Sequence, residues 1–170
     1  QGKIELDAPI AAYWPEFGCK GKQSATVRQA MLHQAGIPIR GLYTQIFLWP
    51  RWNLVARNVA RLRAEFPPGT RTSYHMVNFG FILGEIVRRV SGLPIRVYLH
   101  EQFLRPLGLT NSALGLPDPW RQRAAWIYSG HKEQDRAVFL FNLPPIRRSI
   151  IPAATLQSTA RDLAVFYQML

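Results

Sequence analysis

The sequence predicts a helix-rich part of a globular protein, and three observations lead to this fold class. Hydrophobic residues make up 48% of the 170-residue chain and charged residues 18%, a balance typical of folded domains. Apolar side chains recur at helical spacing in two segments, residues 51–66 and 77–90. Proline and glycine interrupt the chain between such segments, which favours helices joined by long connections.

The first predicted helix begins at Thr26, because Gln29 three residues later completes a capping-box pattern. It is expected to run to about Gln34, where Gly36, with Pro38 beyond it, stops it. Residues 2–17, which precede this helix, are expected to form a loop with a short amphipathic piece.

The second predicted helix, residues 51–66, has one apolar stripe made by Trp52, Val55, Val59, Leu62 and Phe66. Arg57 and Arg61 lie off this stripe and are expected to face solvent. Two prolines and a glycine follow directly, which predicts a sharp turn with Gly69 at positive φ.

Two further helices are predicted in the middle of the chain. Residues 77–90 carry a stripe of Ile82, Ile86 and Val90, and Ser91-Gly92 closes the helix. Residues 94–104 begin with proline in the first turn, a position where its missing N–H costs nothing, and end at Pro106-Leu107-Gly108.

The C-terminal third is less regular. Four prolines between residues 115 and 152 favour loops, with short strands around residues 137–143. Thr159, with Asp162 three residues later, predicts the start of a last helix. Its buried face is expected to consist of Leu163, Phe166, Tyr167 and Leu170.

The charge does not predict a nucleic-acid partner. The formal net charge is +11, yet the basic residues occur singly or in pairs and never in a block of five. No basic stripe alternates with stacking aromatic residues, so a solvated arginine-rich surface is the favoured interpretation. A basic module that binds an anionic polymer is the alternative. No apolar run approaches the roughly 20 residues that cross a bilayer, so no membrane span is expected in this segment.

Generic catalytic and cofactor motifs are absent from the sequence. There is no G-x-S-x-G, no phosphate-binding GxxxxGK[ST] and no HExxH. Cys19 is the only cysteine, which excludes an internal disulfide, and the histidines His33, His75, His100 and His131 lack metal-ligand spacing. We therefore expect neither a metal nor another cofactor, and as a nucleophile Cys19 has no placed histidine partner.

Four short phrases occur in a fixed order, at residues 26–36, 66–74, 106–112 and 156–164. They resemble the TVRHLLTHTSGL, PGTxxxYS, PLGMxxT and STAxDLARF phrases of the serine β-lactamase and penicillin-binding-protein family. The likeness is greatest to its class C-like branch, which includes family VIII-type esterases and D-amino-acid peptidases. Residues 2–9 resemble the GKLxLDDPV phrase of the same branch.

This resemblance implies an α/β (α+β) fold, an antiparallel sheet flanked by helices, of which residues 1–170 supply mostly the helical region. The chain starts with Gln1 rather than Met and ends in a predicted helix, so we expect an internal part of a longer domain. The family's nucleophile lies in an S-x-x-K motif, which occurs nowhere in this chain. The resemblance places that motif before residue 1 and a third motif, a strand with Lys or His, beyond Leu170.

The resemblance assigns the family's catalytic tyrosine to Tyr74. A tyrosine hydroxyl titrates near pH 10 in water, so it acts as a base only beside cations, here the lysines outside the chain. The resemblance implies that Tyr74 moves a proton between nucleophile and leaving group. The structural alternative is a buried tyrosine that only satisfies a hydrogen bond in its loop.

Three neighbours of Tyr74 are candidate substrate contacts. Met76 stands where β-lactamases of this branch have an asparagine that binds the substrate amide, which favours esters over lactams. Asn78 could substitute for that asparagine, and His75 is a candidate base or substrate contact. Ser73 is a weaker candidate nucleophile, since no lysine follows it by one helical turn.

Milder departures from the family phrases occur elsewhere. Ala35 replaces a serine, Ala154 and Thr155 replace two glycines, and His33 matches a family histidine with a structural role.

The predicted function is therefore a serine hydrolase that forms an acyl-enzyme on a small ester, amide or peptide-like substrate. A relative that binds without turnover is the second hypothesis. The sequence assigns neither a cellular compartment nor an oligomeric state.

Overall fold

The computed structural model describes residues 2–37, 46–130 and 135–170. Pro38 and His131 lie outside the described residues. The N-terminal elements are α1 (Ile10–Tyr13), η1 (Pro15–Phe17), α2 (Val27–Met31), η2 (Ile46–Leu48), α4 (Trp52–Arg61), α5 (Asn78–Ser91), α6 (Ile95–Leu99) and the π-helix η3 (His100–Leu104). The C-terminal elements are β1 (Ala113–Leu114), η4 (Asp118–Trp120), α7 (Asp135–Asn142), α8 (Pro144–Arg148), β2 (Leu156–Gln157) and α9 (Ala160–Gln168).

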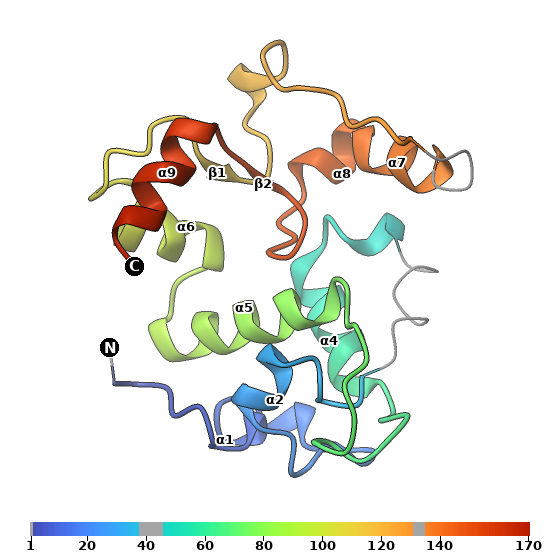
Figure 1. Cartoon of the computed structure of the whole chain (residues 1–170). Coiled ribbons are helices and arrows are strands. Elements are labelled where there is room, and N and C mark those ends of the chain that lie inside the picture. Colours follow the sequence, from blue (N-terminus) through green and yellow to red (C-terminus); the bar gives the residue numbers. More distant parts are fainter. Residues whose placement is uncertain (1, 38–45, 131–134) are drawn as a thin grey trace.

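Helix α5 is the centre of the molecule. It runs across the middle of Figure 1 and contacts α1, α2, α4 and α6. The predicted apolar stripe of this helix is confirmed for Ile82 and Ile86, which are at most 1% exposed, while Val90 is half-buried. Phe81 and the α4 residues Val55 and Val59 are fully buried beside them. The core is thus a helix-on-helix layer, in keeping with a helix-rich part of an α/β fold.

The capping box predicted at Thr26 is confirmed. Its Oγ1 accepts a hydrogen bond from Gln29 N at 3.1 Å, and Gln29 Oε1 accepts one from Thr26 N at 3.0 Å. The helix ends at Met31 rather than near Gln34, because His33 has a left-handed backbone with φ of 58°. Such a conformation cannot continue an α-helix.

Helix α4 ends earlier than predicted for a reason that lies elsewhere in the chain. It stops at Arg61, and Leu62 is already extended. Lys22 is completely buried, and its ammonium donates hydrogen bonds to the carbonyl oxygens of Ala60, at 3.1 Å, and Leu62. These carbonyl groups are the ones a helix C-terminus leaves unpaired, so Lys22 fixes the end of α4. Arg57 and Arg61 are exposed, as predicted.

The strands predicted around residues 137–143 are wrong, because this stretch forms α7. A short apolar run does not distinguish a strand from a helix, and here Pro144 starts a new helix, α8, instead of a loop. The strands of the described residues lie elsewhere. In β1 and β2, Ala113 pairs antiparallel with Gln157 and Leu114 with Leu156.

The last helix begins as predicted, but most of its predicted buried face is exposed. Thr159 Oγ1 accepts a hydrogen bond from Asp162 N, which confirms the cap. The predicted buried face is wrong, because Leu163, Tyr167 and Leu170 are 41%, 68% and 82% exposed and Phe166 is only half-buried. Asp162 is the buried residue of α9, at 5% exposure.

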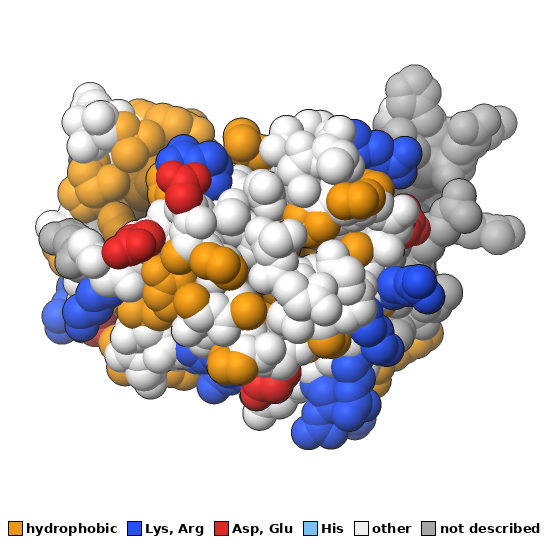
Figure 2. Space-filling model, turned by 90° about the horizontal axis from the view of Figure 1, so that it is seen from below, with side chains coloured by type: hydrophobic (Ala, Val, Ile, Leu, Met, Phe, Trp, Pro, Cys, Tyr) orange, Lys and Arg blue, Asp and Glu red, His pale blue; other side chains and the backbone are white. Residues whose placement is uncertain are grey.

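The surface of the described residues has dispersed charge. Figure 2 shows basic side chains at several separate places around one face, with apolar and acidic side chains between them. In the part of the chain that the structure describes, no helix has the length and apolar character that a bilayer crossing requires.

Candidate active site

Tyr74 lies on the connection between the turn at Gly69 and the start of α5. Its side chain is 60% exposed, and its hydroxyl makes no hydrogen bond with a described residue. The structural alternative, a buried tyrosine that satisfies its own loop, therefore does not apply. Gly69 has a φ of 83°, as predicted, and its N–H donates to Gln34 O at 2.9 Å, which ties the turn to the loop after α2.

His33 holds the backbone on both sides of Tyr74. The amide of Ser73 donates to His33 O at 2.9 Å, and the amide of His75 donates to His33 Nδ1 at 3.2 Å. The imidazole of His33 also meets the Tyr74 ring edge-on, with centroids 5.0 Å apart, and the Phe79 ring at 4.7 Å. The structural role predicted for His33 is confirmed by these contacts.

His75 points into the protein. It is 1% exposed, and its Nε2 accepts a hydrogen bond from Ile37 N at 2.7 Å. Since Nε2 is the acceptor, the neutral ring carries its proton on Nδ1. Burial lowers the pKa of His75 below its usual range, an effect that the Ser73 backbone partly opposes and His33 reinforces. His75 therefore links two loops in its neutral form.

The two remaining candidates flank the start of α5. Met76 is half-buried against the core, and Asn78, the first residue of the helix, is 1% exposed. Of the four residues singled out from the sequence, Tyr74 is thus the exposed one. Substrate contacts of His75, Met76 and Asn78 stay predictions.

A buried carboxylate joins two of the four sequence phrases. Asp162 Oδ2 accepts hydrogen bonds from Asn111 N and Ser112 Oγ, both at 2.9 Å. The Ser112 hydroxyl also bonds Ser158 Oγ at 2.7 Å. The sequence indicated Asp162 only as a residue of the first helical turn and missed this anchoring role. The sequence feature that could have indicated this contact is the occurrence of both family phrases, at residues 106–112 and 156–164, in one domain.

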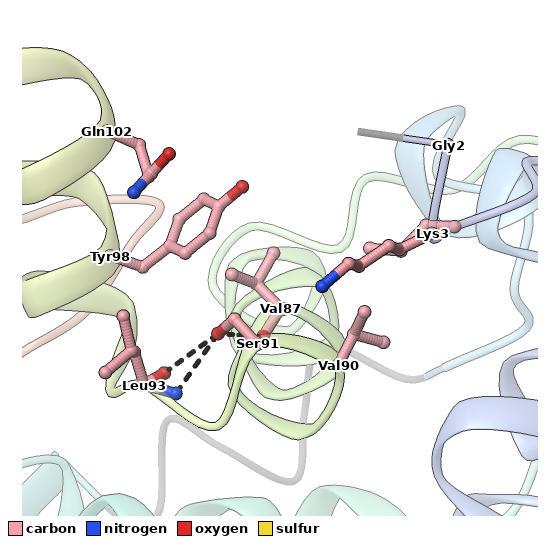
Figure 3. A pocket seen from close by; sticks show the side chains of 9 residues that line it. Gly2, Lys3, Val87, Val90, Ser91, Leu93, Tyr98 and Gln102 are labelled. Carbon is pink, nitrogen blue, oxygen red and sulfur yellow. Dashed lines mark hydrogen bonds between the residues drawn. The ribbon is translucent and has the colours of Figure 1, made fainter.

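A cavity of about 370 Å³ lies between the N-terminal segment, α5 and α6, away from Tyr74. Figure 3 shows the Lys3 and Tyr98 side chains on opposite sides of it, with Val87, Val90 and Ser91 at its floor. The Ser91 hydroxyl donates to Val87 O at 2.7 Å, so it already serves the helix backbone. Over the described ranges, no group of three or more metal-ligating side chains gathers.

The helices around α5 form the helical part of a fold shared with β-lactamase-related proteins. A sequence model described as Beta-lactamase matches residues 1–170, and the chain belongs to that family. The predicted family and its α/β fold are therefore confirmed.

Three known proteins illustrate the similarity. The esterase/beta-lactamase LipL of Mycobacterium tuberculosis is 36% identical over 69% of this chain and 27% of its own length. A penicillin-binding protein homolog from Caulobacter crescentus has a TM-score of 0.80 at 32% identity, covering 96% of this chain and 48% of that one. A family VIII carboxylesterase has a TM-score of 0.84 at 29% identity, and the match covers 98% of this chain and 48% of the carboxylesterase. The chain thus spans about half of these solved structures and about a quarter of LipL.

Proposed function

We propose that the full-length protein is a serine hydrolase that forms an acyl-enzyme on ester or amide substrates, with Tyr74 as a proton-transfer residue. The nucleophilic serine and its lysine would come from an S-x-x-K motif outside residues 1–170. In acylation the serine oxygen bonds the substrate carbonyl carbon, and its proton passes through Tyr74 to the leaving group. Water then releases the acid by the reverse route.

The observation that carries the proposal is the exposed Tyr74 hydroxyl on a fixed backbone. The amides of Ser73 and His75 both bind His33, so the loop cannot turn Tyr74 away without breaking these hydrogen bonds. A proton-transfer group must be held within hydrogen-bond reach of the reacting atoms, and such preorganisation fits that need. The family membership supports the same role.

Esters are the proposed preference. Met76 replaces the asparagine that β-lactamases of this branch use for the substrate amide, and a thioether is only a weak hydrogen-bond acceptor. Two of the similar proteins are named as an esterase/beta-lactamase and a carboxylesterase. We infer that ester turnover exceeds turnover of lactams such as nitrocefin.

The test is the Tyr74→Phe substitution in the full-length protein, assayed by the acylation burst with p-nitrophenyl butyrate. Loss of a positioned proton-transfer group should lower the burst rate by about 10²- to 10⁴-fold. Tyr128→Phe is the matched control, because Tyr128 is also exposed, at 85%, and lies on another loop.

A burst rate unchanged by Tyr74→Phe would remove this residue from the mechanism. Absence of any burst in the unsubstituted full-length protein would instead favour the second hypothesis, a relative that binds without turnover. Residues 1–170 alone are expected to hydrolyse neither nitrocefin nor p-nitrophenyl butyrate, because the proposed nucleophile is outside them.

A further inference from the structure

We propose that the cavity between η1, α4 and α5 binds a small soluble molecule through a phosphate group. The cavity has a volume of about 440 Å³, within the range of small-molecule sites. Four arginines line it, Arg57, Arg61, Arg88 and Arg89, together with Glu16 and Glu85.

The carboxylates neutralise only one side of this cavity. Arg89 is engaged through all three of its side-chain nitrogens: its Nε donates to Glu85 at 2.8 Å and its Nη1 and Nη2 donate to Glu16 at 2.9 and 3.2 Å. Arg88 binds Glu85 through Nε and Nη2, at 2.8 and 2.6 Å. Two of the four positive charges are thereby balanced within the cavity.

The other two positive charges come from α4. Arg57 and Arg61 are exposed and form no ion pair with a described residue. They are four residues apart on one helix, so their side chains are neighbours and repel each other. An anion bound between them would remove this repulsion.

The chemistry of these groups favours a phosphate over a single carboxylate. A guanidinium offers paired N–H donors that match two oxygens of a phosphate, and a dianion would balance both α4 arginines. Arg88 lines the same cavity, and its Nη1 atom makes no hydrogen bond with a described residue. Three arginines from two helices can therefore converge on one ligand.

The cavity lies away from Tyr74. Arg88 lies ten residues beyond Asn78 on α5, which corresponds to about 15 Å along the helix axis. Tyr74 precedes that helix start, and none of the residues around Tyr74 lines the cavity. The inference goes beyond the proposed function and does not depend on it.

The experiment is isothermal titration of the full-length protein with pyrophosphate, at ionic strength held constant with NaCl. We expect saturable binding that the double substitution Arg57→Gln and Arg61→Gln weakens at least tenfold, because it removes two charge-assisted hydrogen-bonding groups. Arg96→Gln with Arg161→Gln is the matched control, since it removes the same charge from exposed positions on other helices. This control should bind as the unsubstituted protein does.

A third variant tests the geometry itself. Glu16→Gln removes one negative charge and one of the two oxygen acceptors that hold Arg89, and should tighten binding of pyrophosphate. Equal weakening in the two double variants, or weaker binding in Glu16→Gln, would overturn the proposal. So would the absence of pyrophosphate binding, including the case in which the protein binds only vesicles of phosphatidylglycerol.

Discussion

Gly36 is the position where one methyl group should disturb the loops around Tyr74 the most. Its φ is 73°, and a Cβ atom there would lie closer than 3.0 Å to the backbone oxygen of Phe66. The left-handed backbone alone costs a residue with a Cβ about 1–2 kcal/mol, partly offset by a less flexible unfolded chain. Moving backbone to relieve the contact adds about 1–3 kcal/mol. We expect Gly36→Ala to lower the free energy of unfolding by about 2–4 kcal/mol.

Gly92 provides a control that separates the two contributions. Its φ is 74°, almost the same as that of Gly36, but a Cβ there would meet no atom within 4 Å. Gly92→Ala therefore carries the backbone cost alone, about 1 kcal/mol. The difference between the two variants measures the contact with Phe66.

The assay is urea unfolding of the full-length variants, followed by the p-nitrophenyl butyrate burst. Gly36 lies three residues after His33, so displacement of this loop should also shift Tyr74 and slow the burst, while Gly92→Ala leaves the burst unchanged. If Gly36→Ala is no less stable than Gly92→Ala, the steric argument is refuted.

Two further predictions concern His75 and Thr26. Because burial places the pKa of folded His75 below its usual 6.5, the unfolded chain takes up this proton first, and stability falls as the pH drops below 6.5. His75→Gln should make the free energy of unfolding, measured in urea at pH 5 to 7, less dependent on pH. An unchanged pH dependence would show that other groups cause it. Thr26→Ala should destabilise the protein by about 1 kcal/mol, because the hydrogen bond from Gln29 N to the Thr26 hydroxyl is lost, whereas Thr26→Ser should keep it. Equal losses of stability in the two variants would show that the hydroxyl does not stabilise this helix.

Local signals in the sequence predicted the starts of helices well. The Thr26 and Thr159 caps need only residues three positions apart, and the stripe of α5 needs only its own period. The same local reasoning placed the end of α4 too late, since that end depends on Lys22, some 40 residues away. It also predicted burial for Leu163 and Tyr167 of α9, which are exposed, and it missed the hydrogen bond that joins Asp162 to Ser112.

The position of Tyr74 shows the same division between local and long-range causes. The phrase at residues 66–74 predicted the turn and the tyrosine, but the exposure of the side chain follows from hydrogen bonds to His33, about 40 residues earlier. His33 can accept both amides because its left-handed backbone ends α2 and turns its carbonyl and ring toward the same loop. The histidine that stops one helix is therefore also the residue that positions the tyrosine before the next.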